Sequence, residues 1–199
     1  MVNKIFTSGV IGMALAATLL AAGWQYVVRA QEIAKPEPEY FGTIYWYDAT
    51  ANKLNPLQRQ KLTLASKTKA LGFGGMKAVS QTDGAKSNVR FAAGQGLDFV
   101  LQASPTLDPH MLVEIVKFDE KGNHRELTQA ESGPLYGGLI GKGGVHQVDK
   151  SSVAFQVKKY SASSIEISPA EPLGPGEYAV RSPGSADVFC FGIDPPAAP

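Results

Sequence analysis

The stretch that decides the fold class runs from Val153 to Ser168 and reads VAFQVKKYSASSIEIS. Apolar residues take every second position in two places: Val153, Phe155 and Val157 in the first half, and Ile165 and Ile167 in the second. The positions between them are mostly polar. A period of two is typical of a β-strand with one face buried. The stretch therefore predicts two strands.

Similar short runs extend outward in both directions. Strands are expected at 40–47 and 53–57 about a turn at 48–52, at 88–92 and 97–102 as a second hairpin, at 111–118 and 124–128 as a third, and at 178–181 and 187–193. Only residues 61–69 are compatible with a short helix. Closely spaced strands with almost no helical periodicity predict an all-β fold, a single antiparallel β-sandwich of the Ig-like or jelly-roll type.

The turn before the last strand pair carries a more specific signal. Pro175-Gly176 lies just before Tyr178, which opens a strand. In Ig-like sandwiches a tyrosine at the start of strand F donates a hydrogen bond back across the corner. The alternative is a type II turn followed by an ordinary strand tyrosine. Both interpretations predict the same fold class.

The N-terminal segment has a different composition. Lys4 precedes an uncharged, apolar run over residues 5–22, and Val28 and Ala30 are small residues in cleavage-site positions. This pattern predicts a secretory signal peptide over residues 1–30. An uncleaved membrane anchor is the alternative, because the run is just long enough to span a bilayer. We expect an exported protein, periplasmic or at the cell surface, or membrane-anchored through this segment alone.

Composition predicts the segments of the rest of the chain and argues against some classes of partner. We expect a flexible tether over 31–39, the β-sandwich domain over 40–194 and a disordered tail over 195–199. The 199 residues include 19 Lys and Arg against 18 Asp and Glu, without a basic stripe, which argues against nucleic acid as a partner. The single cysteine, Cys190, lies in an apolar run and is expected to be a buried core residue.

Motifs of known chemistry are missing from the sequence. The three histidines have no partners at metal-ligand spacing. The glycine-rich stretch 137–144 fails the Walker pattern because Gly143 follows Lys142. Residues 66–69 match Ser-x-x-Lys but lack the accompanying motifs of penicillin-recognising enzymes. We therefore predict neither a metal nor a cofactor.

Four polar residues form the candidate binding site: Lys86, Ser87, Arg90 and Arg125. On a strand, Lys86 and Arg90 would share one face. Arg125 on a neighbouring strand would complete a small cationic patch able to bind a carboxylate or phosphate. The alternative is a solvated face with ion pairs to Glu126 or Asp98.

Short stretches of the chain resemble a group of uncharacterised bacterial exported β-rich proteins. The stretches are Lys86-Ser87-Asn88-Val89-Arg90, the hairpin with Arg125-Glu126, Leu173 to Tyr178, and Phe191-Gly192-Ile193-Asp194. In this group a Lys-Ser-x-x-Arg stretch precedes a strand, and a Pro-Gly-Glu-Tyr turn precedes a terminal Phe-Gly-(Val/Ile)-Asp. The resemblance implies a β-rich fold and an exported address, and no activity.

The expected function is that of a non-enzymatic binding or assembly module of the bacterial envelope. Such a module would meet another envelope protein or a surface ligand through an open edge strand or through end loops near 48–52, 119–123 and 137–144.

The alternative function is a glycan hydrolase or lyase, which needs paired carboxylates in a cleft. The candidate acids are Glu114, Glu126, Glu131 and Glu166. A third hypothesis is an aromatic platform for glycans around Trp46. Strand alternation places Tyr45 and Tyr47 on one face and Trp46 on the other, so at least one side is expected to be core.

Overall fold

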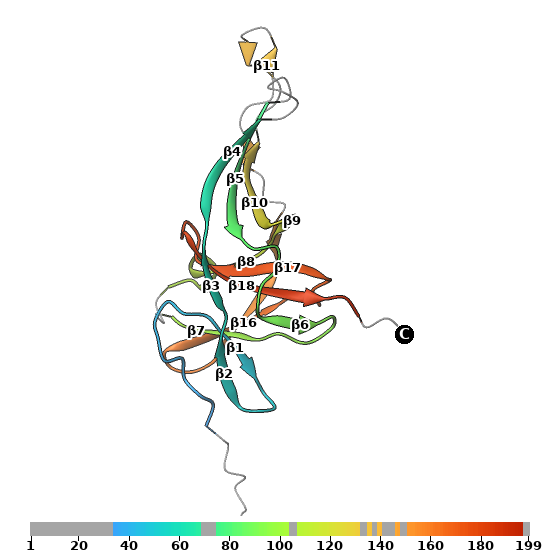
Figure 1. Ribbon diagram of the computed structural model, residues 1–199. Coiled ribbons are helices and arrows are strands. Elements are labelled where there is room, and N and C mark those ends of the chain that lie inside the picture. The colour runs from blue at the N-terminus through green and yellow to red at the C-terminus, as the bar shows by residue number, and fades with distance from the viewer. Residues whose placement is uncertain are drawn as a thin grey trace, which may run out of the picture. The chain divides into compact units, whose positions relative to one another are not determined.

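The computed structural model describes residues 34–68, 75–103, 107–131, 135–136, 139–140, 146–147 and 151–196 (Figure 1). Strands make up nearly all of its regular structure, and the one helix in these ranges is the short α1 (Pro109–Leu112). The prediction of an all-β fold is confirmed. The predicted signal segment 1–30 and most of loop 137–144 lie outside the described residues.

No helix in the described part of the chain is both long and apolar enough to cross a membrane.

Sheet A contains both hairpins that the sequence predicted most directly. Its strand order is β15 (Phe155–Lys159), β16 (Ser164–Pro169), β7 (Phe99–Gln102), β1 (Tyr45–Asp48) and β2 (Lys53–Pro56). All neighbours are antiparallel, and Val157 lies opposite Ile167 in the β15–β16 pair. Apolar side chains at every second position therefore meet on one face of the sheet.

Two further sheets account for most of the remaining strands. Sheet B has the order β14 (Ser152–Val153), β8 (Glu114–Lys117), β17 (Gly176–Arg181), β18 (Asp187–Asp194) and β3 (Gln58–Lys61), with β6 (Arg90–Ala92) parallel to the end of β18. Sheet C has the order β13 (His146–Gln147), β10 (His124–Glu131), β5 (Met76–Asp83) and β4 (Thr63–Thr68), with β9 (Asp119–Lys121) also on β10. The strands β11 (Leu135–Tyr136) and β12 (Leu139–Ile140) form a separate pair.

Sheet B contributes to two hydrophobic clusters, one on each face. Tyr178, Val180, Phe189, Phe191 and Ile193 join the first cluster, which also holds residues of sheet A such as Phe99 and Ile167. Ala179, Val188 and Cys190 join the second cluster, together with Leu127 of sheet C. Burial on both faces explains why residues 188–193 read as a continuous apolar run and not as an alternating one. The finer prediction of one sandwich stays a prediction.

Several predicted elements differ from the structure. The hairpin expected from 88–92 and 97–102 is wrong, because β6 pairs with β18 and β7 lies between β1 and β16. In the third expected hairpin, β8 joins sheet B, and the pair about the turn is β9 with β10. Residues 63–68 form β4, so the helical interpretation of 61–69 is wrong.

The corner before β17 has the predicted hydrogen bond. The Tyr178 hydroxyl donates to the carbonyl oxygen of Gly174 at 2.9 Å, and its ring stacks on Phe191. Gly176 between them has φ +146°, a conformation that favours glycine, and a Cβ there would lie 3.0 Å from Cε of Lys117. The tyrosine thereby fixes the angle at which the chain enters sheet B.

The structure describes part of the predicted tether. Residues 35–40, called the strap below, make hydrogen bonds with sheet A. The Tyr160 hydroxyl donates to the carbonyl oxygen of Pro36, and the Gln102 amide donates to that of Pro38, both at 2.8 Å. This part of the chain therefore makes defined contacts, because Gln102 of β7 and Tyr160 of the β15–β16 turn provide donors for its carbonyl groups. The tether itself stays a prediction.

Candidate functional site

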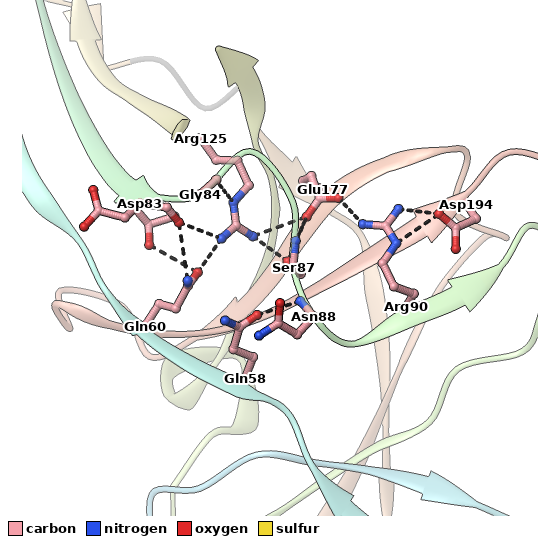
Figure 2. Close-up of polar contacts among 11 residues, drawn as sticks. Gln58, Gln60, Asp83, Gly84, Ser87, Asn88, Arg90, Arg125, Glu177 and Asp194 are labelled. Atoms are coloured by element: carbon pink, nitrogen blue, oxygen red, sulfur yellow. Dashed lines mark hydrogen bonds and ion pairs between the residues drawn. The ribbon is translucent and has the colours of Figure 1, made fainter. Parts of the chain in front are cut away.

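Three of the four predicted site residues come together, around a carboxylate that the sequence analysis did not assign (Figure 2). Arg125 extends from β10, while Ser87 and Arg90 lie on the segment that leads into β6. They meet at Glu177 of β17. Lys86 lies before β6 in a bend, so the prediction that it shares a strand face with Arg90 is wrong, and its side chain is exposed.

The guanidinium group of Arg125 is fully buried at 0% exposure and surrounded by acceptors. Its nitrogens donate to the carbonyl oxygens of Asp83 (3.2 Å) and Gly84 (3.0 Å), to Glu177 Oε2 (3.2 Å), and to the side-chain oxygens of Gln60 and Ser87. An arginine has five N–H donors, and these five contacts can use all of them. Its charge is therefore fully hydrogen-bonded inside the protein.

The Glu177 carboxylate is equally buried, at 1% exposure. Oε2 accepts hydrogen bonds from the backbone N–H and the hydroxyl of Ser87, both at 2.7 Å, and from Arg125. Oε1 accepts from Nη1 of Arg90. The cationic patch that the sequence predicted for a carboxylate thus binds a carboxylate of the chain itself.

Arg90 links this buried centre to the surface. Its Nε and Nη2 donate to Oδ1 of Asp194 at 2.9 and 2.6 Å. The hydrogen bonds with Asp194 raise the pKa of Arg90, and those with Arg90 lower the pKa of Asp194. Lys86 adds a smaller effect in lowering the pKa of Asp194 through its charge. Arg90 is 24% and Asp194 50% exposed, so the ion pairs extend from the core to solvent.

Gly192 makes room for this arrangement. A Cβ at this position of β18 would lie 2.6 Å from Cζ of Arg90 and 2.6 Å from Oε1 of Glu177. Any larger residue would have to displace the ion pair, because atoms cannot approach so closely. The three motifs of the sequence resemblance, Lys-Ser-x-x-Arg, Pro-Gly-Glu-Tyr and Phe-Gly-Ile-Asp, therefore meet at one place. We call Ser87, Arg90, Arg125, Glu177 and Asp194 the Glu177 network.

The alternative prediction, ion pairs from these basic residues to Glu126 or Asp98, also differs from the structure. Glu126 accepts hydrogen bonds from Lys67 and, at 2.7 Å, from His124, while Asp98 accepts one from the Ser168 hydroxyl at 2.5 Å. Neither acid pairs with Arg90 or Arg125 in the contacts of the described residues. Glu177 occupies the position at which an external anion would bind. That an external ligand binds at Lys86, Ser87, Arg90 and Arg125 stays a prediction.

The candidate acids whose side chains the structure describes are each bound to a basic group. Glu114 pairs with Arg181 at 2.8 Å, and Glu166 lies 3.7 Å from Nζ of Lys35 and 3.8 Å from that of Lys158. Burial raises the pKa of Glu126, but the hydrogen bonds from Lys67 and His124 outweigh it, so that the pKa is lowered. The side chain of Glu131 lies outside the described residues. Carboxylates arranged in this way serve as ion-pair partners.

Cys190 lies buried in the second hydrophobic cluster. Burial raises the pKa of Cys190 to about 11, so its thiol stays protonated at neutral pH. The prediction that it is a buried core residue is confirmed. In the ranges that the structure describes, no three His, Cys, Asp or Glu side chains lie close enough together to hold a metal ion.

Sheet C ends in an edge strand with few protecting features. No described strand pairs with the outer edge of β4. Its only charged residue, Lys67, is held by Glu126, and Leu64 is 72% exposed. The other edge strands of four or more residues carry charges or proline: Lys53 and Pro56 on β2, Arg59 and Lys61 on β3, and Lys158 and Lys159 on β15. Charges and proline on an edge oppose pairing with another chain, and β4 carries one such residue where each of these three strands carries at least two. Among these four edges, β4 is the least protected.

Comparison with known proteins yields no relative: no family model, no curated protein and no solved structure matches this chain. The resemblance to exported β-rich proteins accordingly stays a prediction.

Proposed function

We propose that this chain is a non-enzymatic, exported binding or assembly module of the bacterial cell envelope, and that it binds an envelope protein by strand addition to β4. Sheets A and B form the predicted sandwich in this proposal, and sheet C is a third layer that carries the binding edge. The open edge of β4 is the observation on which the proposal depends.

Strand addition uses the backbone groups of an edge for affinity and adjacent pockets for specificity. β4 offers both. Its outer backbone groups have no strand partner among the described residues. Beside it lies a hollow of about 400 Å³ between the exposed face of β4 and the β17–β18 turn, lined by residues that include Leu62, Leu64, Ser80 and Ala186. A side chain of an added strand could enter this hollow while its backbone pairs with β4.

The pairing of the acids supports a binding module over the glycan hydrolase. A hydrolase of this kind needs two carboxylates that face each other across a cleft and work as acid and base or nucleophile. Glu114, Glu126 and Glu166 instead lie on different sheets, and each forms its own ion pairs. The exported address is supported by the signal-like segment 1–30.

Site-specific photocrosslinking in the envelope of a Gram-negative host tests the binding edge. A photoreactive residue replaces Ser66, which is exposed on β4, and in a matched control replaces Gln156, which is exposed on the edge strand β15. We expect an adduct of one defined mass from position 66 and none from position 156. No adduct at 66, or the same adduct at both positions, would contradict strand addition at β4.

A second variant separates edge pairing from simple proximity. Leu64→Lys adds a charge to the β4 edge, where lysine opposes strand addition, and it should reduce the position-66 adduct severalfold. Gln156→Lys is the matched control and should leave it unchanged. Intact mass tests the export step: a periplasmic species that lacks 22, 23 or 30 N-terminal residues is expected. A full-length species in the membrane fraction would indicate the uncleaved anchor, and a full-length cytoplasmic species would contradict export.

A further inference from the structure

The strap lies over the middle of the outer face of sheet A. Strand register places Tyr45, Val100 and Glu166 side by side on this face, opposite to the face with Trp46 and Phe99. Val100 is 0% exposed and Tyr45 6%. Neither belongs to the two clusters that flank sheet B. The strap contacts this outer face, and its backbone N–H at Tyr40 donates to the Tyr45 hydroxyl at 3.3 Å.

The charged end of Lys35 enters a cage of two rings and one acid. Its Nζ lies 4.9 Å from the centre of the Tyr160 ring and 5.6 Å from that of Tyr47, and 3.7 Å from Oε2 of Glu166. The two rings pack edge to face with centres 5.9 Å apart. Aromatic faces together with a carboxylate are a general means of binding an ammonium group.

The next strap residues are bound just as specifically. Oε2 of Glu37 accepts hydrogen bonds from the hydroxyls of Ser161 (3.0 Å) and Ser164 (2.9 Å). The carbonyl oxygens of Pro36 and Pro38 accept from Tyr160 and Gln102, as described above. Proline has no backbone N–H, so Pro36 and Pro38 present only their carbonyl oxygens, which are acceptors. The groove supplies the matching donors.

Two features show that these donors are built into sheet A. Ser164 is only 3% exposed and lies opposite Gln102 in the strand register, so the two donors sit side by side. Burial, with the nearby charges of Tyr47, Glu37 and Glu166, raises the pKa of Tyr160 to about 12. Its hydroxyl therefore keeps its proton and donates at any ordinary pH. Each of the four residues 35–38 thus has a defined partner.

We propose that this groove is a peptide-binding site that reads an extended Lys-Pro-Glu-Pro segment, and that it takes this segment from a second copy of the chain as well as from its own strap. The strap joins β1 through a short surface turn, in which Gly42 has φ +74°. Lys35 itself is 52% exposed. No strap residue belongs to either of the two main clusters. A second copy offers the same contacts, which is the condition for exchange between protomers.

The tether sets the affinity scale for this site. A segment linked by a short connection competes at an effective concentration on the order of millimolar. A groove that its own strap fills must therefore bind the free segment with a dissociation constant of about 1 mM or lower. Binding in trans should be measurable once the strap of the receptor is weakened.

Fluorescence titration with a labelled peptide tests the site. The receptor is the full chain with Lys35→Ala and Glu37→Ala, and the probe is the acetylated peptide AKPEPEY, which corresponds to residues 34–40. We expect saturable binding at about 1 mM or below. A control peptide, AAPAPEY, should bind at least tenfold more weakly, as should the wild-type receptor, whose groove is filled. Equal binding of both peptides, or no binding by the variant, would overturn the proposal.

Two further measurements make the result specific. Tyr160→Phe in the same receptor keeps the ring but removes the hydroxyl donor, and it should weaken peptide binding severalfold; an unchanged affinity would contradict the assigned contact.

Sedimentation of the wild-type chain should show dimers that increase with concentration and disappear in the Lys35→Ala/Glu37→Ala variant. Dimers that persist in that variant, or no dimers in the wild type at millimolar concentration, would overturn exchange between copies. Leu64→Lys should not alter them, so this proposal and that for β4 fail separately.

Discussion

The Glu177 network and the strap use similar side chains in opposite ways. Both combine a basic group, a carboxylate and serine hydroxyls. In the network, Arg125 and Glu177 are 0% and 1% exposed, and every charge is matched by hydrogen bonds within the protein. In the strap, Lys35 remains half exposed, so water can replace a lost partner. Burial, more than residue type, therefore decides whether such contacts hold the fold or permit exchange.

The largest expected effect comes from removing one partner of the buried pair. Arg125→Met leaves the Glu177 carboxylate without its main buried cation, and breaking a buried pair typically costs about 3–5 kcal/mol. We expect a loss of this size in the free energy of unfolding, measured by urea denaturation. Lys35→Ala is the matched surface change and should cost about 1 kcal/mol or less.

Removing the second charge as well makes this test more exact. If the cost arises from an unpaired buried carboxylate, Arg125→Met combined with Glu177→Gln should be less destabilised than the sum of the two single changes. Strict additivity would show that Arg125 and Glu177 are not coupled. Equal losses for Arg125→Met and Lys35→Ala would show that the network is no more important to the fold than the strap.

A smaller loss is expected from Gly192→Ala. The added methyl group meets Arg90 and Glu177 and must push the ion pair aside, and overpacking of this kind typically costs about 1–3 kcal/mol. Gly96→Ala is the control, because a Cβ there has no heavy atom within 4 Å. Similar urea midpoints for the two variants would contradict the close approach of Arg90 to β18.

The exposed end of the network should give the smallest effect, visible as a pH dependence. Because Arg90 lowers the folded-state pKa of Asp194, this pair stabilises the protein above the ordinary aspartate pKa, and the contribution is lost as pH falls through the lowered value. Asp194→Asn should therefore be less stable than wild type at pH 7, with the difference shrinking toward pH 2. A constant difference, or an equal one for the exposed Asp83→Asn, would contradict this linkage.

Local patterns predicted the elements whose partners are near in sequence. The alternation of Val157 and Ile167 identified the β15–β16 hairpin, and the turn before Tyr178 identified the corner hydrogen bond. β6 was placed wrongly because its partner is β18, about a hundred residues further along the chain. A glycine-bearing loop such as 94–96 predicts a turn, but the strand that pairs after the turn depends on the packing of Phe91 and Phe99 in the shared core.

The candidate site shows the same limit. Sequence reasoning grouped Ser87, Arg90 and Arg125 but missed Glu177, which lies 87 residues from Arg90. The available signal was an acid placed directly before the apolar residues 178–180, in a strand with both faces buried. Such an acid needs buried cations, and a cluster of arginines needs an anion. Joining the two requirements would have identified the network as internally paired.

The central place of β18 has a consequence for the order of events during biosynthesis. Residues of this last strand belong to both hydrophobic clusters, and β17, β3 and β6 all pair with it. A polypeptide made from its N-terminus can therefore complete neither cluster before residues 187–194 have been made. Both faces of sheet B are therefore completed by the segment that is made after all the other described strands.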